Sequence, residues 1–184
     1  MKILGFVGSP RKGGNTEILV SEVLAGAAEK GAETAIYNLN ELDIKGCQSC
    51  FYCSDYPGCA RKDDMQKLLE EIRNADAVVI GTPIYMWQMS GQTKIFVDRM
   101  LPFLNPEYSL RGERDKGLVL VFTQWQEDPN AFADYFRCTG DMMESLGFSL
   151  QDILIGAGME DKEGALKHKE VLARARKAGR ALFK

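Results

Sequence analysis

Short apolar runs alternate with helical patterns along nearly the whole chain, and this alternation limits the possible folds more than any other feature. Five runs are apolar enough to be buried strands: residues 2–8, 33–38, 77–81, 117–123 and 150–156. Apolar residues recur at helical spacing between them, over about 15–30, 65–72, 91–101 and 130–146, and a basic helix closes the chain. Strands that are apolar at almost every position are typical of a parallel sheet with helices on both faces. We therefore predict a three-layer α/β sandwich.

The number of strands and their helical connections suit a flavodoxin-like fold, with a five-stranded parallel sheet of order 2-1-3-4-5. Ligands bind such sheets at the carboxyl ends of the strands, near the switch between strands 1 and 3. The loops at 8–16 and 81–91 leave these two strands. We expect the two loops to form a site together, with Thr123-Gln124-Trp125 after the fourth strand as a further wall.

Size and charge exclude several functional classes. The 184 residues suit a single domain over 1–184, and 45% hydrophobic and 27% charged residues are a globular composition. A net charge of −3 gives no basic excess for nucleic-acid binding. No apolar stretch approaches the roughly 20 residues that cross a bilayer, and the N-terminus lacks a signal-peptide pattern. We expect a cytoplasmic protein without nucleic-acid or membrane partners, whose cysteines serve metals or redox chemistry rather than disulfides.

The loop at 8–16, GSPRKGGNT, has the composition of a phosphate-binding loop that leads into a helix. The N–H groups at the start of a helix bind anions, hydroxyl and amide groups add donors, and arginine adds a permanent cation. Glycine lets the backbone approach the ligand without a side-chain clash. The candidate phosphate ligands are Ser9, Arg11, Gly14, Asn15 and Thr16.

Two other nucleotide-binding motifs fit this loop less well. A nucleoside-triphosphate loop requires lysine and a hydroxyl residue after its last glycine, where this chain has Gly14 and Asn15. A dinucleotide fingerprint requires a second glycine where this chain has Pro10. A single phosphomonoester, as in FMN, fits better than either. A glycine-rich turn with an Asn or Thr helix cap is the alternative that needs no ligand.

Four of the five cysteines lie close together in a segment at about 46–62: Cys47, Cys50, Cys53 and Cys59. A [4Fe-4S] cluster requires four soft ligands around a small volume, and the C-x2-C-x2-C run suits it. Zinc sites usually use two separated C-x2-C pairs, and a redox dithiol uses only one pair. The iron-sulfur cluster is therefore our preferred interpretation, while zinc and thiols without a persistent metal stay open. The fifth cysteine, Cys138, is expected to be a small core residue on a helix.

These motifs together resemble the NADPH-dependent FMN reductase family of flavodoxin-like proteins. The loop at 8–16 resembles its phosphate loop, and residues 81–85, GTPIY, resemble its second flavin loop. The cysteine spacing and the DDM sequence at 63–65 resemble the iron-sulfur flavoprotein branch of that family. The resemblance extends from residue 1 to about 100.

The resemblance implies roles for individual residues. The FMN phosphate would be held by Ser9, Arg11, Asn15 and Thr16. The isoalloxazine ring would be bordered by Pro83, Ile84, Tyr85, Met86 and Trp87. Aromatic side chains and backbone amides in such a loop can stack on the ring and bond its polar edge, although loop aromatics that only pack on the core are the plainer alternative. Relatives of this branch form oligomers, so a homodimer or homotetramer is implied.

We expect an FMN-containing redox protein that passes electrons between a [4Fe-4S] cluster and FMN, from ferredoxin to a small-molecule acceptor. We predict no catalytic acid or base, because a flavin itself carries the electrons. The alternative is an NAD(P)H-dependent FMN or quinone reductase without a cluster. A zinc-stabilised interaction module is a third hypothesis, from a different class.

Charged residues outside these motifs have structural explanations. Asp63 and Asp64 are expected to cap the helix that follows them, since acidic residues favour a first helical turn. Lys94, Asp98 and Arg99 lie at helical spacing and are expected to form an ion pair on their own helix.

Overall fold

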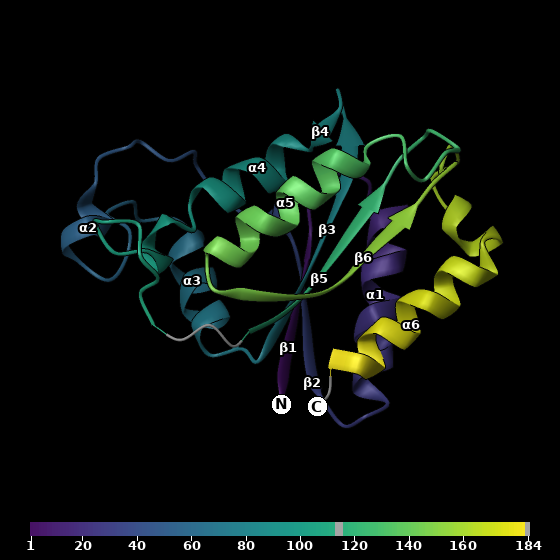
Figure 1. The fold of residues 1–184 in the computed structure, drawn as a ribbon, viewed down its shortest axis with the longest axis horizontal. Coiled ribbons are helices and arrows are strands. Elements are labelled where there is room, and N and C mark those ends of the chain that lie inside the picture. The colour runs from purple at the N-terminus through teal and green to yellow at the C-terminus, as the bar shows by residue number, and fades with distance from the viewer. Residues whose placement is uncertain (113–115, 183–184) are drawn as a thin grey trace.

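Five parallel strands form the central sheet of the protein in a computed structural model, which describes residues 1–112 and 116–182 (Figure 1). The strands are β1 (Lys2–Val7), β2 (Glu33–Asn38), β3 (Ala77–Tyr85), β5 (Lys116–Thr123) and β6 (Phe148–Gly156). They lie in the order β2-β1-β3-β5-β6. This confirms the predicted order 2-1-3-4-5. A short β4 (Gln88–Met89) also pairs antiparallel with the end of β3.

Helices cover both faces of the sheet, which confirms the three-layer prediction (Figure 1). One face carries α1 (Asn15–Ala28) and α6 (Lys169–Leu182). The other face carries α3 (Met65–Arg73), α4 (Gly91–Asp98) and α5 (Ala133–Ser145). The short α2 (Tyr52–Asp55) lies in the cysteine segment, apart from the sheet. Three 3-10 turns complete the elements: Leu39–Glu41, Leu101–Phe103 and Gly164–Lys167.

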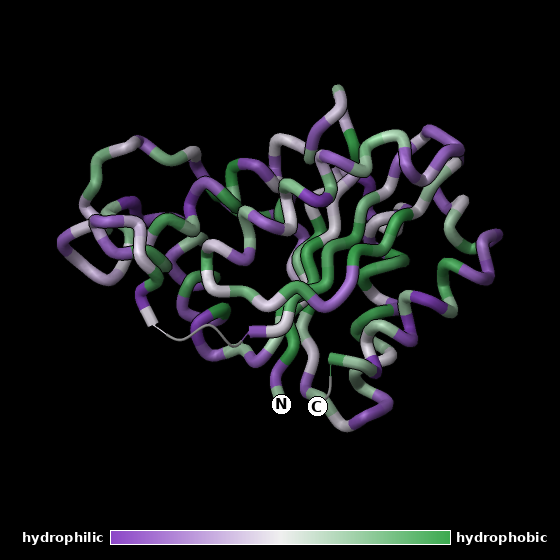
Figure 2. Tube along the Cα trace, in the orientation of Figure 1, coloured by the Kyte–Doolittle hydropathy of each residue, from purple (hydrophilic) through white to green (hydrophobic). Residues whose placement is uncertain are grey.

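The core follows directly from the apolar strands. Hydrophobic residues fill the middle of the sheet, and hydrophilic residues lie mostly on the outer helix faces (Figure 2). On one face α1 and α6 approach so closely that their contact requires glycine. A Cβ on Gly26 would lie 2.0 Å from the carbonyl oxygen of Arg176, and a Cβ on Gly179 would lie 1.8 Å from that of Val23. No helix in the described residues is long and apolar enough to cross a membrane.

Two details differ from the sequence predictions. The helix predicted over 91–101 ends at Asp98, and a 3-10 turn containing Pro102 follows it. Proline lacks the N–H group that would continue the helical hydrogen bonds. The prediction that Cys138 lies in the core is wrong, because it is exposed on α5. The inward face of that helix is formed by residues at helical spacing: Phe136, Thr139, Gly140 and Met143.

Candidate functional site

A pocket lies at the carboxyl ends of the strands, where the loops after β1, β3, β5 and β6 meet. Eight of the predicted cofactor residues line it: Ser9, Arg11, Asn15, Thr16, Pro83, Ile84, Tyr85 and Thr123. Gln124 and Trp125 form the expected further wall. Met159, Glu160 and Lys162 line it as well, and no sequence motif indicated them. The loops expected at the switch point therefore line one cavity, together with the loop after β6.

Gly14, Met86 and Trp87 do not line this pocket. Gly14 is the N-cap residue of α1 and has an extended backbone conformation. Because glycine has no side chain, it cannot cap the helix with a side-chain hydrogen bond. Met86 and Trp87 form the tight turn between β3 and β4 and are 83% and 67% exposed. Both have left-handed backbone conformations, with φ of 45° and 69°. Their assignment to the flavin ring stays a prediction.

The phosphate loop is shaped by backbone geometry at the start of α1. Gly13 has φ of +66°, a conformation that glycine adopts without strain. The Gly14 N–H bonds the carbonyl of Arg11 at 3.0 Å, and the Arg11 N–H bonds the Ser9 hydroxyl at 3.2 Å. The N–H groups in the first turn of a helix have no partner within the helix. Together with the Arg11 guanidinium they form a site with the charge and donors for a phosphate group.

Two residues of the predicted phosphate set also link this loop to distant parts of the chain. The Thr16 and Thr123 hydroxyl groups share a buried hydrogen bond of 2.7 Å, which ties α1 to the end of β5. The Asn15 amide nitrogen donates to the carbonyls of Met159 and Asp161, at 3.3 and 2.6 Å. Its amide oxygen accepts from the N–H of Ala165 at 2.8 Å. The Asn15 side chain therefore anchors the loop after β6, and its contact with phosphate stays a prediction.

The first two loops are joined by Ser90, which is fully buried. Its hydroxyl donates to the Gly8 carbonyl at 2.6 Å and accepts from the Thr93 N–H at 3.3 Å, which caps α4. The Ser90 N–H donates to the Thr82 hydroxyl at 3.0 Å. A Cβ on Gly8 would lie 1.8 Å from the Thr93 hydroxyl oxygen, so only glycine fits there. Sequence reasoning missed Ser90, although a serine before a helix is a recognisable cap.

The wall after β5 carries an unpaired polar atom. The Gln124 amide nitrogen donates to the carbonyls of Gln126 and Asp128, at 3.2 and 2.7 Å, but its oxygen is buried without a partner in the described residues. The Trp125 ring is exposed, and its Nε1 donates to Glu160 at 2.7 Å. An open helix N-terminus, a free buried acceptor and exposed aromatic rings fit a ligand with a phosphate and a flat ring that has polar edges. These residues thus fit FMN.

The cysteine segment has a different character. Cys47 and Cys50 are exposed, whereas Cys53 and Cys59 are partly buried. Burial raises the pKa of the Cys53 thiol. No three His, Cys, Asp or Glu side chains within residues 1–112 and 116–182 are close enough to hold a metal ion. Four thiols are the kind of donor set that a [4Fe-4S] cluster requires, but the described structure does not bring them together into one ligand group.

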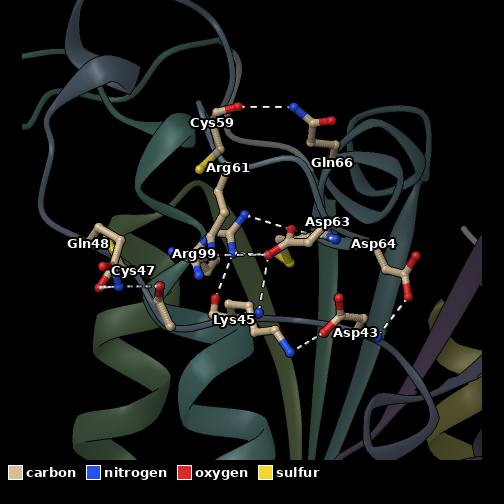
Figure 3. Close-up of polar contacts among 12 residues, drawn as sticks. Asp43, Lys45, Cys47, Gln48, Cys59, Arg61, Asp63, Asp64, Gln66 and Arg99 are labelled. Carbon is tan, nitrogen blue, oxygen red and sulfur yellow. Dashed lines mark hydrogen bonds and ion pairs between the residues drawn. The ribbon is translucent and has the colours of Figure 1, made fainter.

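A buried ion pair lies beneath this segment (Figure 3). Two guanidinium nitrogens of Arg99 bond the two carboxylate oxygens of Asp63, at 2.7 and 2.9 Å, and one of them also bonds the Lys45 carbonyl at 2.6 Å. The two side chains are 1% and 2% exposed. Burial alone would raise the pKa of Asp63, but hydrogen bonds from Arg99 and from the Lys45 and Met65 N–H groups hold it below its ordinary value.

This pair corrects two predictions. Asp63 accepts from the N–H of Met65 at 3.2 Å, as a residue before a helix would, yet its main partner is Arg99 rather than α3. The Asp64 carboxylate makes no cap and accepts instead from the N–H of Asp43. The helical ion pair expected on α4 is confirmed for Lys94 and Asp98, at 2.5 Å, but excludes Arg99. Arg99 follows Asp98 at the end of α4, and its side chain bonds the Lys45 carbonyl at the start of the cysteine segment instead of the exposed Lys94–Asp98 pair.

Comparison with known proteins agrees with this geometry. Residues 1–123 match the model of the NADPH-dependent FMN reductase family. An iron-sulfur flavoprotein of Methanocaldococcus jannaschii is 37% identical over 113 residues, which cover 61% of this chain and 58% of that protein. An NAD(P)H-dependent FAD/FMN reductase of Geobacillus thermodenitrificans is 35% identical over 102 residues, 55% of this chain and 52% of that protein. The chain thus matches little more than half the length of these relatives.

Solved structures support the fold. An NAD(P)H:quinone oxidoreductase from Methanothermobacter marburgensis superposes with a TM-score of 0.77, covering 100% of this chain and 98% of that one, at 19% identity. The matched family region contains β1 to β5, and with them the phosphate loop, the cysteine segment and the second flavin loop. The chain belongs to the NADPH-dependent FMN reductase family.

Proposed function

We propose that this protein is a flavin-dependent oxidoreductase that binds FMN in the pocket after β1, β3, β5 and β6 and a [4Fe-4S] cluster on the four clustered cysteines. Its electron donor would be ferredoxin or NAD(P)H, and its acceptor a small molecule. The observation that carries the proposal is the pocket, which is lined by Ser9, Arg11 and Thr16 of the phosphate loop and by side chains from the loops after β3, β5 and β6. When bound, FMN exchanges one or two electrons and a cluster exchanges one, so the two connect different classes of partner.

The phosphate end of the pocket is the β1–α1 loop. The Ser9 and Thr16 hydroxyls and the first N–H groups of α1 would donate to the phosphate oxygens, and Arg11 would neutralise their charge. Gly14, at the helix N-cap, would leave the backbone accessible. Asn15 would act from its backbone N–H while its side chain keeps the loop after β6 in position.

The ring end of the pocket is formed by apolar and aromatic side chains. Pro83, Ile84 and Tyr85 would cover one side of the ring, with the exposed Met86 and Trp87 of the β3–β4 turn at its rim. Thr123 and Gln124 would meet a polar edge, since the Gln124 oxygen is a buried acceptor that lacks a donor. A flat hydrophobic slot with a few polar groups orients a flavin and excludes water from it.

Cys47, Cys50, Cys53 and Cys59 would ligate the cluster. The support is chemical, because the four soft ligands that a cluster requires are complete within one short segment. Binding would have to draw the thiols together, because the described residues contain no preformed metal group. A homodimer or homotetramer remains part of the proposal.

The test is to measure iron, acid-labile sulfide and FMN per chain in protein prepared without oxygen. About four irons and four sulfides for each FMN are expected. FMN without iron would overturn the cluster assignment but keep the flavin pocket. The absence of both would overturn the proposed function.

One observation favours a second candidate, an NAD(P)H-dependent FMN or quinone reductase without a cluster. The cysteine thiols do not converge in the described residues, and the similar Geobacillus protein is named for NAD(P)H-dependent flavin reduction. Rapid bleaching of bound flavin by NAD(P)H in iron-free protein would support this candidate. Faster reduction of iron-loaded protein by reduced ferredoxin would support the first.

A further inference from the structure

One side chain holds both ends of the cysteine segment. Arg99 reaches from the end of α4 to the carbonyl of Lys45, just before Cys47, and to the carboxylate of Asp63, just after Cys59 (Figure 3). The Lys45 N–H also donates to Asp63 at 3.1 Å, across 18 positions of sequence. The two ends of the segment are therefore joined to each other through one buried ion pair.

The same place contains unused hydrogen-bond donors. The Nε atoms of Arg99 and Arg61 are both buried and have no hydrogen-bond partner in the part of the chain that the structure describes. Arg61 Nε lies 3.6 Å from an Asp63 oxygen, too far for a hydrogen bond. A buried N–H without an acceptor is rare in folded proteins because its desolvation is not compensated. Arg99 and Arg61 both lie against Asp63, so the two unused donors belong to one group of side chains.

Cys59 is the cysteine next to these donors. Burial alone would lower the pKa of Arg99, but its hydrogen bonds to Asp63, the charge of Asp63 and the neighbouring Cys59 side chain raise it. Cys59 and Arg61 lie with Arg99 and Asp63 in one group (Figure 3). Sulfur bound to iron carries negative charge and accepts N–H hydrogen bonds, and both features set the reduction potential of a cluster.

We propose that Arg99, held by Asp63, is a positioning residue for the cysteine segment, and that its Nε–H, with that of Arg61, donates to sulfur at the Cys59 corner of the bound cluster. The first half concerns the chain alone, whereas the second half rests on the proposed function. Two arginines and the Asp63 carboxylate carry one net positive charge, and this charge with two N–H···S bonds would stabilise the more negative, reduced state of a bound cluster. The cluster potential would therefore be less negative than it would be without them.

Arg111 provides a matched control on the same segment. Its guanidinium donates to the carbonyls of Ser54 and Tyr56, both at 3.1 Å, near the end of α2. Its Nε donates to Asn105 at 3.3 Å, so this arginine, unlike Arg99, has a partner for its Nε–H. Arg111 therefore supplies the same charge and the same kind of carbonyl contact, but neither joins the two ends of the segment nor faces Cys59.

The contacts of Arg99 with the Lys45 carbonyl and the Asp63 carboxylate, called the clamp below, are tested on protein without metal. The full chain with FMN bound and iron removed is compared by amide hydrogen exchange as wild type, as the double variant Arg99→Met/Asp63→Leu, and as Arg111→Lys. Replacing both charges of the buried pair with apolar groups avoids an unpaired buried charge, so the fold is retained. We expect exchange over residues 45–63 to be at least tenfold faster in the double variant, with β1 and α1 unchanged. Exchange within twofold of wild type would overturn the clamp.

The donor role is tested on iron-loaded protein. Arg99→Lys keeps the cation but loses Nε and the paired contact with Asp63. We expect its cluster to have a more negative reduction potential than wild type, with Arg111→Lys at the wild-type value. Equal shifts in both variants, or none in Arg99→Lys, would overturn the donor role. Wild-type protein that takes up no iron would overturn the proposed cluster and the donor role together, while the exchange result would still decide the clamp.

Discussion

The flavin pocket and the cysteine segment are the two proposed cofactor sites, and the fold holds them in opposite ways. The pocket walls come from loops that leave neighbouring strands, and buried hydrogen bonds of Asn15, Thr16 and Ser90 join these walls to one another. The cysteine segment lies away from the strand ends, around the four-residue α2 (Figure 1). Arginine contacts with backbone carbonyls hold it, at its base by Arg99 and near α2 by Arg111.

This difference indicates which of the two sites is already formed without its ligand. A parallel sheet brings the carboxyl ends of its strands together whether or not a ligand is present, so the pocket is built with the fold. A loop closed only at its base leaves its middle free to adjust. Under the proposed function iron would draw the cysteines together, because metal binding supplies the free energy that orders such a site.

The largest difference between the two sites is expected in the cofactor content of Cys50→Ser. A hydroxyl replaces one of four soft ligands, so iron per chain should fall at least tenfold while FMN per chain stays at the wild-type value. Iron and flavin are measured on the same oxygen-free preparation. Cys138→Ser, on the exposed face of α5, is the control and should change neither. Loss of FMN together with iron would show that the two sites are not independent.

The next effect is on stability. Asp63→Ala leaves the Arg99 cation buried without its partner, and we expect the free energy of unfolding to fall by about 3–5 kcal/mol. Urea unfolding at neutral pH measures it. Asp98→Ala removes the exposed partner of Lys94, and such pairs contribute only about 0.3–0.5 kcal/mol. Similar losses in the two variants would mean that the Arg99 pair does not stabilise the base of the segment as its burial indicates.

Asn15→Ala tests the crosslinks of the pocket. It removes three hydrogen bonds to the loop after β6, so the free energy of unfolding should fall by about 2–3 kcal/mol. FMN should also bind more weakly, since that loop carries Lys162 into the pocket. Flavin fluorescence titration and urea unfolding measure the two effects. The exposed Asn40→Ala is the control, and a change in FMN affinity there would remove the specificity of the result.

Arg11→Gln tests the phosphate end with little expected effect on folding, because Arg11 is exposed. Loss of one charge-assisted contact to phosphate should weaken FMN binding about tenfold, or about 1.4 kcal/mol. Riboflavin, which lacks the phosphate, should bind wild type and variant equally well. An equal loss for both ligands would mean that Arg11 does not contact the phosphate. Iron content should stay at the wild-type value.

The smallest expected effect is a change in the stability contribution of Asp63 at acidic pH. The pKa of Asp63 is lower in the folded chain than its ordinary value, so its stabilising contribution is full above about pH 4, the ordinary Asp pKa, and disappears as pH falls through the folded value. In urea unfolding at a series of pH values, the stability gap between wild type and Asp63→Asn should therefore narrow below about pH 4. A gap that stays constant into acid would contradict the depressed pKa.

The sequence predicted the flavin pocket better than the cysteine segment, and particular residues show why. Ser9, Arg11, Thr16 and Thr123 lie at the ends of strands whose order follows from local apolar patterns. The assignment of Met86 and Trp87 to the flavin ring stays a prediction. The β3–β4 turn leaves both side chains exposed, with left-handed backbones that no local pattern indicated.

By itself, the sequence determined the strands, their parallel order, the glycine-rich loop and the set of four thiols, because each depends on residue type at short spacing. Only the tertiary structure decided which side chains meet across long separations. Asn15 bonds the loop 150 positions away, and Arg99 pairs with Asp63, 36 positions earlier, instead of with its helical neighbours. A periodic pattern records which face of an element is buried, but a long polar side chain finds its partner only once the elements are packed.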